Sequence, residues 1–399
     1  MKPNLTQSLK ILMVSPQFRP IAGGYERAAE RLSEGLVARG HSVEVVTERR
    51  STDWPRRELS NGVIIYRIPV IYLRGLHSVT STLSLLFFLL TRARHFDIIH
   101  VHQYGWSAGA SAFVGLVFGK PTLLKLTNTG RQGLDATLPR GVLGAALRWL
   151  HRNISCCIVT SKRAEEEAKA FGFSDKRVAL IPNALETEVF KPVTQSEKQK
   201  IRAELNIHSR FAVLSAARMS PEKNHKMLID AWERFASKTK NVELILLGSG
   251  ALLEDVRRWA KATDVRNTIR VVGYTETPLH WYQAVDAYAL SSDIEGLSNS
   301  LMEALSSGLA VVSTRVSGSE DIFKAADVGE IVDVGDGEAL AKALSILEND
   351  HERHVACGLA ARNYAVAHYA LERITRITED CYLEQLTIQD SDRGGAFSS

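Results

Sequence analysis

Cysteine is scarce in this chain, with four residues among 399, at positions 156, 157, 357 and 381. They form no CxxC pair and no spacing typical of a metal site, so we expect neither a disulfide scaffold nor a structural metal centre. Cys156 and Cys157 lie in the segment SCCIVTS, which is typical of a buried strand. Buried free thiols in a reducing compartment explain this pattern most simply, and we expect a cytoplasmic protein.

Long apolar segments are also missing. The most apolar run, LSLLFFLL at residues 83–90, is far shorter than the ~20 residues that a membrane-spanning helix needs. Arg74 on one side and Arg92 and Arg94 on the other predict a buried or interfacial helix. The first ten residues are polar and resemble no signal-peptide core. We therefore expect no membrane span.

Charge of one sign does not dominate the chain, whose net charge is +4. Clustered basic stripes are absent, so nucleic acid is not an expected partner. The first hundred residues nevertheless carry fourteen Lys/Arg and eight Asp/Glu. This excess is compatible with peripheral contact between the N-terminal domain and an anionic surface, such as the inner face of a membrane, and equally with scattered solvated arginines.

What the chain does contain is a repeated alternation of short apolar strands and amphipathic helices, which predicts parallel sheets covered on both faces. A polar segment at residues 191–210 interrupts this alternation. We predict an α/β protein of the GT-B architecture, with two Rossmann-like, doubly wound parallel-sheet domains facing an interdomain cleft. The predicted parts are an N-terminal domain at 1–190, a C-terminal domain at 191–370, a helix at 371–387 packing back on the N-terminal domain, and a disordered tail at 388–399.

Ligands of such sheets lie beyond the carboxyl ends of the strands, so the loops that follow the strands are the candidate sites. After the first strand, Gly23 and Gly24 precede a helix whose free amides could meet an anion, although a simple turn also explains two glycines. In the second half, Arg218 ends a strand and Lys223 precedes a helix. Two cations at this place suit a diphosphate, and surface charges beside a turn are the alternative.

The segment DIEGLSNSLMEALSSG, residues 293–308, holds two glutamates separated by seven residues. Glu295 lies in a loop on the ligand side of the sheet. Glu303 has two interpretations: it completes a capping box with Ser300, or the helix starts at Ser298 or Asn299 and Glu303 points toward a ligand. The backbone amides expected at this helix N-terminus belong to Leu297, Ser298, Asn299 and Ser300.

The segment LILLGSGALLE resembles the beginning of a dinucleotide fingerprint, with Gly248 and Gly250 in place. The third glycine position is Leu253, and no acidic residue follows on a later strand. NAD is therefore not an expected cofactor.

Taken in order, several segments resemble retaining GT-B glycosyltransferases of the family 4 type, the glycosyl transferases of group 1. The resemblance spans roughly residues 10–370 and is carried by the E-x7-E region EGLSNSLMEALSSGLAVVSTRVSGSEDI and by GGYERAAERLSEGLVARGHSVEVVT, FDIIHVHQ, VALIPNALETEVFKP, AARMSPEKNHKMLIDAW and LILLGSG. It implies that a nucleotide-sugar is bound mainly by the C-terminal domain, and the family favours a UDP-sugar. It also implies transfer to a glycan or lipid-linked acceptor in cell-surface polysaccharide or glycolipid synthesis.

The same resemblance assigns roles to individual residues. Arg218 and Lys223 would hold the diphosphate and stabilise it as it leaves, Glu303 would bind the ribose hydroxyls, and Glu295 would bind the donor sugar. Gly24, beside Gly23, would offer its amide to the donor. Two cations and helix-end amides would meet the developing negative charge, so no metal or other cofactor is expected. The only DxD-like motif, DSD at residues 390–392, lies in the polar tail.

One departure from the family pattern and one acceptor-side candidate concern the first domain. Asn128 stands where the family often has a histidine that touches the donor sugar, which leaves the choice of sugar open. His102 is an acceptor-side candidate, and a core histidine is an equal alternative. A nucleotide-sugar 2-epimerase on the same fold and a catalytically silent scaffold remain alternative functions, although E-x7-E fits transfer better.

Overall fold

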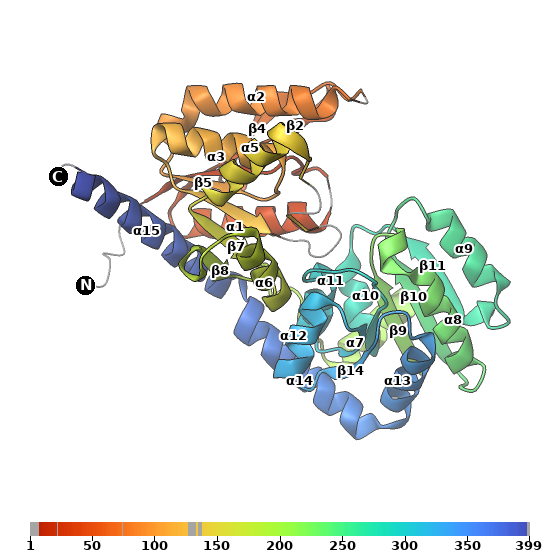
Figure 1. Ribbon diagram of the computed structural model, residues 1–399. Helices are drawn as coiled ribbons and strands as arrows, with labels where there is room; N and C mark the ends of the chain where they lie inside the picture. Colours follow the sequence, from red (N-terminus) through yellow and green to blue (C-terminus); the bar gives the residue numbers. More distant parts are fainter. Residues whose placement is uncertain (1–7, 22, 74, 127–132, 135–137, 397–399) are drawn as a thin grey trace. The chain divides into compact units, whose positions relative to one another are not determined.

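In a computed structural model of the protein, residues 8–21, 23–73, 75–126, 133–134 and 138–396 are described (Figure 1). The chain divides into two compact units, of which unit 1 comprises Met1–Ala184 and Leu371–Ser399, and unit 2 comprises Leu185–Ala370. The sequence predicted the boundary at residue 191, whereas the structure divides the chain between Ala184 and Leu185. The reason is local: the amide of Leu185 donates to the carbonyl of Tyr369 at 2.8 Å, and the Leu185 side chain lies in the core of unit 2.

Unit 1 is built on an eight-stranded sheet in which all neighbouring strands are parallel except one antiparallel pair, β3 with β4. In spatial order the strands are β3 (Arg57–Ser60), β4 (Val63–Pro69), β2 (Ser42–Arg49), β1 (Lys10–Val14), β5 (Ile98–Val101), β6 (Thr122–Leu126), β7 (Cys156–Val159) and β8 (Val178–Leu180).

Helices cover both faces of this sheet, which is why its central strands are apolar throughout. Every residue of β5, β6 and β7 is buried. One face packs against α2 (His77–Arg92), α3 (Trp106–Phe118), α5 (Gly141–Arg152) and α6 (Lys162–Phe171). The other face packs against α1 (Gly24–Ala38) and α15 (Leu371–Ala396). The described part of the unit also contains the 3-10 turns η1 (Ala93–His95) and η3 (Asp175–Arg177).

The C-terminal helix α15 packs beside α1. The hydroxyl of its Tyr382 lies 2.6 Å from Nδ1 of His100, and both side chains are fully buried. The helix continues to Ala396, whereas the sequence predicted its end at 387 and a disordered tail beyond. Hydroxyls in this polar segment bond to helix carbonyls, as Thr387 does to Leu383 and Ser391 to Thr387, each at 2.9 Å, so polarity there does not interrupt the helix.

Unit 2 is built on a six-stranded, fully parallel sheet. In spatial order the strands are β11 (Ile269–Gly273), β10 (Val242–Leu247), β9 (Phe211–Ala216), β12 (Ala287–Leu290), β13 (Ala310–Thr314) and β14 (Gly329–Val332). The helices are α7 (Gln195–Glu204), α8 (His225–Ala236), α9 (Leu253–Ala262), α10 (Pro278–Ala284), α11 (Asn299–Ser306), α12 (Ser317–Ala325), α13 (Gly337–Asn349) and α14 (His351–Tyr369), with 3-10 turns η4 (Pro221–Lys223) and η5 (Arg266–Thr268).

The spatial order of unit 2 is that of a doubly wound sheet: the chain builds outward from β9 to one edge, returns to β12 and builds outward to the other edge. Core residues on one face of the sheet pack against α8, α9 and α13, and those on the other face pack against α7, α10, α11, α12 and α14. The prediction of two Rossmann-like parallel-sheet units is confirmed.

All four cysteines are buried and free. The apolar run at residues 83–90 lies in α2, where only Leu85 and Leu89 are buried, while Leu83 and Phe87 are exposed. The expectation that this helix packs inside the domain therefore holds for one of its faces. Within the described ranges, no helix combines the length and apolarity that a bilayer crossing demands.

Candidate functional site

In unit 2, the predicted site residues gather where the strand order reverses. The neighbouring strands β9 and β12 are the first strands of the two halves of the sheet. The loop after β9 carries Arg218 and Lys223, and the loop after β12 carries Glu295. This reversal point is where open α/β sheets bind their ligands.

Lys223 and Glu295 are in direct contact, although they are 72 residues apart in the chain. The ammonium group bonds to Oε2 of the carboxylate, and the two side chains are only 17% and 18% exposed. The hydroxyl of Ser292 lies 3.5 Å from the same oxygen. A cation and a carboxylate that the sequence assigned to opposite ends of one ligand therefore form a single ion pair in this structure.

The two loops are also joined through their backbones. The hydroxyl of Ser291 donates to the carbonyl of Lys223 at 2.8 Å, and the amide of Asp293 donates to the carbonyl of Glu222 at 2.8 Å. Asn224, which has a left-handed φ of 47°, donates from its side chain to Asp293 at 2.8 Å and caps α8. The relative position of Lys223 and Glu295 is thus fixed by the surrounding loops.

Arg218 is exposed, and its guanidinium has no hydrogen bond or ion pair among the residues that the structure describes. The backbone on either side of Arg218 passes close to the two glycines that follow β10, Gly248 and Gly250. A Cβ at Gly248 would lie 1.9 Å from the carbonyl oxygen of Ala217, and one at Gly250 would lie 2.4 Å from that of Met219. The GSG segment, which the sequence related to a dinucleotide fingerprint, lets the Arg218 loop pass close to β10.

Helix α11 begins at Asn299 and is capped by Ser298, whose hydroxyl accepts from the amide of Leu301 at 3.4 Å. The capping box between Ser300 and Glu303 therefore does not form, and the expected helix start at Asn299 is confirmed. That Glu303 points toward a ligand stays a prediction. Glu303 lies inside the helix and is 4% exposed. The chain does form a capping box elsewhere, where Thr194 and Glu197 begin α7.

Tyr288, a residue of β12, explains why Ser300 is not the cap, and the sequence reasoning missed it. The Tyr288 hydroxyl lies 2.7 Å from the hydroxyl of Ser300 and 3.2 Å from the carbonyl of Ala216. Burial raises the pKa of Tyr288, and the nearby Glu295 and Glu303 raise it further. A single large polar ring in the otherwise small and apolar strand AYAL was the available signal.

The loop after β13 supports the Glu295 loop from its other side. The amide of Gly318 donates to the carbonyl of Gly296 at 2.6 Å, and a Cβ at Gly318 would lie 2.4 Å from that oxygen. The hydroxyl of Thr314 donates to the carbonyl of Ser292 at 2.7 Å. Leu297 and Ser298, which were expected to offer amides, are buried between these segments.

His225 follows the Lys223 loop as the first residue of α8 and is 2% exposed. Among the described residues, neither ring nitrogen has a hydrogen-bond partner. Burial lowers the pKa of His225 to about 4, and the nearby Lys223 lowers it further. His225 is therefore neutral at pH 7 and leaves the positive charge of this loop on Arg218 and Lys223.

In unit 1, Gly23 is the N-cap of α1 and Gly24 is its first residue, exposed at the helix N-terminus. A Cβ at Gly23 would lie 2.2 Å from Oε2 of Glu26, so glycine leaves room for that carboxylate. The amide of Arg27 donates to the carbonyl of Gly23 at 3.1 Å. Asn128, the other candidate of this unit, lies outside the described residues.

His102 lies just after β5 and is 2% exposed. Its ring stacks on His100 with centroids 4.4 Å apart, and its Nε2 lies 3.3 Å from Sδ of Met13. Burial lowers the pKa of His102 to about 3, and the buried Lys125 lowers it further. This environment is that of a core histidine, which is the alternative that the sequence left open for His102.

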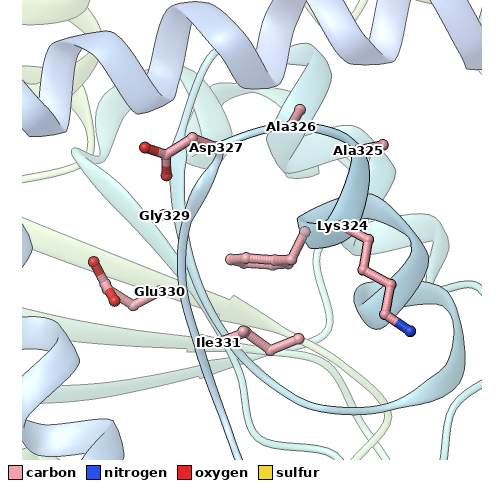
Figure 2. A pocket seen from close by; sticks show the side chains of 8 residues that line it. Lys324, Ala325, Ala326, Asp327, Gly329, Glu330 and Ile331 are labelled. Carbon is pink, nitrogen blue, oxygen red and sulfur yellow. The ribbon is translucent and has the colours of Figure 1, made fainter.

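An open recess of about 420 Å³ lies between the end of α12 and the start of β14, lined by residues 323–327 and 329–331 (Figure 2). The recess lies at the amino end of β14, whereas Lys223 and Glu295 follow the carboxyl ends of β9 and β12, at the opposite end of the parallel strands. Two of its carboxylates, Asp327 and Glu330, are bound by Arg353 at 3.4 and 2.6 Å. It contains none of the predicted site residues.

Across the part of the chain that is described, no group of three His, Cys, Asp or Glu side chains is placed to hold a metal ion.

Comparisons with known proteins agree with this geometry. Residues 23–184 match the family "Glycosyl transferase 4-like domain", and residues 197–364 match "Glycosyl transferases group 1". The "Phosphatidylinositol N-acetylglucosaminyltransferase GPI3 subunit" of Saccharomyces cerevisiae is 26% identical over 325 residues, which are 78% of this chain and 69% of that protein. The "D-inositol 3-phosphate glycosyltransferase" of Xylanimonas cellulosilytica is 24% identical over 388 residues, 90% of this chain and 92% of that protein.

Among solved structures, HepE of Anabaena in complex with UDP and glucose superimposes with a TM-score of 0.78 at 17% identity, over 94% of this chain and 99% of that chain. This likeness shows the shared fold. The two family matches together cover most of the chain, one in each unit, and agree with the relatives just described. The chain therefore belongs to the GT-B glycosyltransferases of the family 4 type and is a glycosyltransferase.

Proposed function

We propose that this glycosyltransferase moves a sugar from a nucleotide-sugar, with UDP as the favoured nucleotide, to a glycan or lipid-linked acceptor in cell-surface polysaccharide or glycolipid synthesis, with retention of the anomeric configuration. The observation that carries the proposal is the contact between Lys223 and Glu295 beside the exposed Arg218, at the strand-order reversal of unit 2. The name of the yeast relative and the UDP and glucose held by HepE support the choice of donor and acceptor class.

The charge flow of the reaction explains the two cations. Breaking the bond between sugar and diphosphate leaves negative charge on the diphosphate and positive charge on the anomeric carbon. The free guanidinium of Arg218 can bond to two phosphate oxygens at once, while Lys223 supplies a compact charge. Cations fixed at the place where charge develops stabilise the transition state more than the ground state. They provide the charge stabilisation that metal-dependent transferases obtain from a divalent ion, so we propose that no metal is needed.

Because Lys223 and Glu295 are paired, binding of the donor changes the partner of both side chains. When the diphosphate binds, Lys223 exchanges the Glu295 carboxylate for phosphate oxygens, and the carboxylate is left to accept hydrogen bonds from hydroxyls of the donor sugar. Glu303, buried in α11, is assigned to the ribose hydroxyls. The N-terminus of α11, at Ser298 and Asn299, adds backbone amides and the positive end of the helix dipole.

In unit 1 the exposed Gly24 is the first residue of α1, and we assign its amide to the donor because the family resemblance implies that role. We propose that the acceptor attacks from the face that the diphosphate leaves, which preserves the anomeric configuration. In this scheme Glu295 binds the sugar and forms no covalent bond to it.

The donor can be tested with purified full-length protein and a panel of UDP-, GDP- and ADP-sugars. A true donor should raise the melting temperature and the corresponding free nucleotide should do so too, because a ligand that binds only the folded state stabilises it by mass action. Nuclear magnetic resonance of the product with a lipid-linked or glycan acceptor then reports the anomeric configuration, and excess EDTA tests the need for a metal. Lack of stabilisation by every nucleotide-sugar would contradict the proposed site, and an inverted product would contradict the mechanism.

A further inference from the structure

Three helices of unit 1 carry exposed apolar side chains on one layer of the fold. Helix α2 packs beside α3, and α3 packs beside α5, on the same side of the sheet (Figure 1). We define the apolar face as the large hydrophobic residues that these helices expose, together with those of the segment before α2. They are Ile71, Tyr72, Leu73, Leu76, Val79, Leu83, Phe87, Leu90, Trp106, Phe113, Leu116, Val117, Val142, Leu143 and Trp149.

Exposure of these side chains is extensive. Phe87 is 72% exposed, and Leu83 and Trp149 are each 60% exposed. In α2 the exposed positions follow one another at intervals of four and three residues, so they form a stripe along one side of the helix. Single exposed hydrophobic residues are normal in soluble proteins, but a contiguous set on three adjacent helices marks an interaction surface.

A neighbouring helix shows that this exposure is not general. Helix α6 covers the same face of the sheet, yet its sequence KRAEEEAKAF places charged residues outward, and none of its residues is an exposed large hydrophobic side chain. On the other face of the sheet, α1 likewise exposes no large hydrophobic residue among those described. The apolar face is therefore confined to α2, α3 and α5 with the segment before them.

The formal charges carried by the three helices of the apolar face are of one sign. Helices α2, α3 and α5 contain no Asp or Glu. Between Val70 and Arg152 the sequence has nine Lys/Arg and two Asp/Glu, whereas the rest of the chain has 40 Lys/Arg and 43 Asp/Glu. The net positive charge of the protein thus originates in this one stretch. Arg94 and Arg152 are exposed just after or at the ends of their helices, and Lys120 is partly exposed after α3.

We propose that the apolar face docks on an anionic phospholipid surface. The apolar side chains would enter the boundary between head groups and acyl chains, and the surrounding Arg and Lys would meet the phosphates. The helices have 16, 13 and 12 residues, so they can lie in the interface but cannot cross the bilayer. This surface does not depend on the proposed sugar donor, because it belongs to unit 1, whereas Arg218, Lys223 and Glu295 belong to unit 2.

The charge also favours an anionic lipid surface over a second copy of the chain as the partner of the apolar face. A two-fold dimer through the apolar face would place its cations opposite the same cations of the partner, with no carboxylate on α2, α3 or α5 to compensate. An anionic lipid surface removes this repulsion and adds attraction, which is worth about a fivefold change in affinity for each Lys or Arg at the surface.

The test is co-sedimentation of the full-length protein with vesicles of phosphatidylcholine containing about one third phosphatidylglycerol, at low and high salt. We expect binding that weakens with salt and falls about tenfold or more in the variant Leu83→Glu/Phe87→Glu. The matched control is Val355→Glu/Leu359→Glu, which has the same spacing on α14 and a similar exposure of 55% and 64%. The control should bind as the wild type does. The variant Arg94→Ala/Lys120→Ala should bind these vesicles about 25-fold more weakly than the wild type, and its binding should depend less on salt.

The outcomes separate the alternatives. Absence of vesicle binding by the wild type would overturn the proposal, and so would equal loss in the α14 control. A dimer in light scattering that dissociates in Leu83→Glu/Phe87→Glu, without vesicle binding, would assign the face to a second copy instead. Circular dichroism and nucleotide-induced stabilisation are measured for each variant, so that a failure to fold or to bind the donor is distinguished from a failure to bind lipid.

Discussion

The Lys223 ammonium contacts the Glu295 carboxylate, which joins the loop after β9 to the loop after β12. In the proposed reaction these groups serve opposite ends of the donor, one at the diphosphate and the other at the sugar. Because each is more than four-fifths buried, each needs a partner of opposite charge when no donor is bound. The ion pair provides that partner, and the donor must displace it.

Replacing Lys223 with alanine should lower kcat by about 100-fold or more, because the leaving diphosphate loses a fixed cation. The matched control is Lys226→Ala, since Lys226 lies three residues on, is exposed and forms an ion pair with Asp230 within α8. That variant should keep wild-type kinetics. Turnover of the nucleotide-sugar by Lys223→Ala at the wild-type rate would show that the diphosphate binds elsewhere.

The double variant Lys223→Ala/Glu295→Gln tests the ion pair itself. Lys223→Ala leaves a largely buried carboxylate without its cation, so it should lower the melting temperature, and the second substitution should restore part of the loss. Activity should not return, since the cation is still missing. Thermal unfolding of the four members of the cycle gives the coupling, and strict additivity would contradict the contact.

Glu303→Gln should raise the KM for the donor about tenfold or more, because a neutral amide replaces a carboxylate that accepts hydrogen bonds from ribose hydroxyls. The comparison variant is Thr194→Ala, which removes the capping box of α7. It should cost about 1 kcal/mol of stability and leave the KM unchanged. If Glu303→Gln behaved in the same way as Thr194→Ala, its role would be purely structural.

Gly248→Ala should both destabilise unit 2 and lower turnover. Its new Cβ would lie 1.9 Å from the carbonyl oxygen of Ala217, so the backbone that carries Arg218 must move. We expect a loss of about 3 kcal/mol or more in urea unfolding. Gly335→Ala is the control, because Gly335 also has a positive φ, of 85°, but no atom lies within 4 Å of its Cβ. It should lose only about 1 kcal/mol and keep full activity.

Lys125→Met should stabilise the protein at pH 7. Lys125 is 3% exposed, and burial lowers its pKa to about 8, with no carboxylate opposing the shift. Between about pH 8 and the ordinary lysine pKa of about 10.4 the unfolded chain binds more protons than the folded one, so wild-type stability rises with pH across this window. The variant should therefore exceed the wild type by about 3 kcal/mol below pH 8, and the difference should vanish above pH 10.5. Urea unfolding at pH 7 and pH 10.5 measures it; a difference independent of pH would refute the electrostatic cause.

Most of the fold could be predicted because each central strand is short and apolar, and because glycine or a polar segment follows it. Arg218, Lys223 and Glu295 could be placed for the same reason: they lie in the loops that follow such strands, and the carboxyl ends of parallel strands lie on the same side of a sheet. The direct contact between Lys223 and Glu295 was not predictable, since it depends on how Asn224 and Asp293 join the two loops.

The start of α11 shows where local reasoning ends. Ser298 and Ser300 are both competent N-caps, and the sequence offers no means to choose between them. The choice is made by the hydroxyl of Tyr288, which lies twelve residues away on β12 and bonds to Ser300. In a similar way, the run at residues 83–90 is too apolar for its sequence to reveal that one side of α2 remains exposed.

The bond between His100 and Tyr382 has a consequence for the order of events during synthesis. Translation completes the sheet of unit 1 by residue 180 and then all of unit 2, before it reaches α15. Until then one face of the first sheet lacks α15, whose Tyr382 contacts His100 and whose apolar residues pack in the same core as Ile11 and Ile158. A ribosome-bound chain thus carries an apolar sheet face that is covered by α1 but not by α15 while unit 2 folds, and we expect this intermediate to be the form of the protein that needs a chaperone.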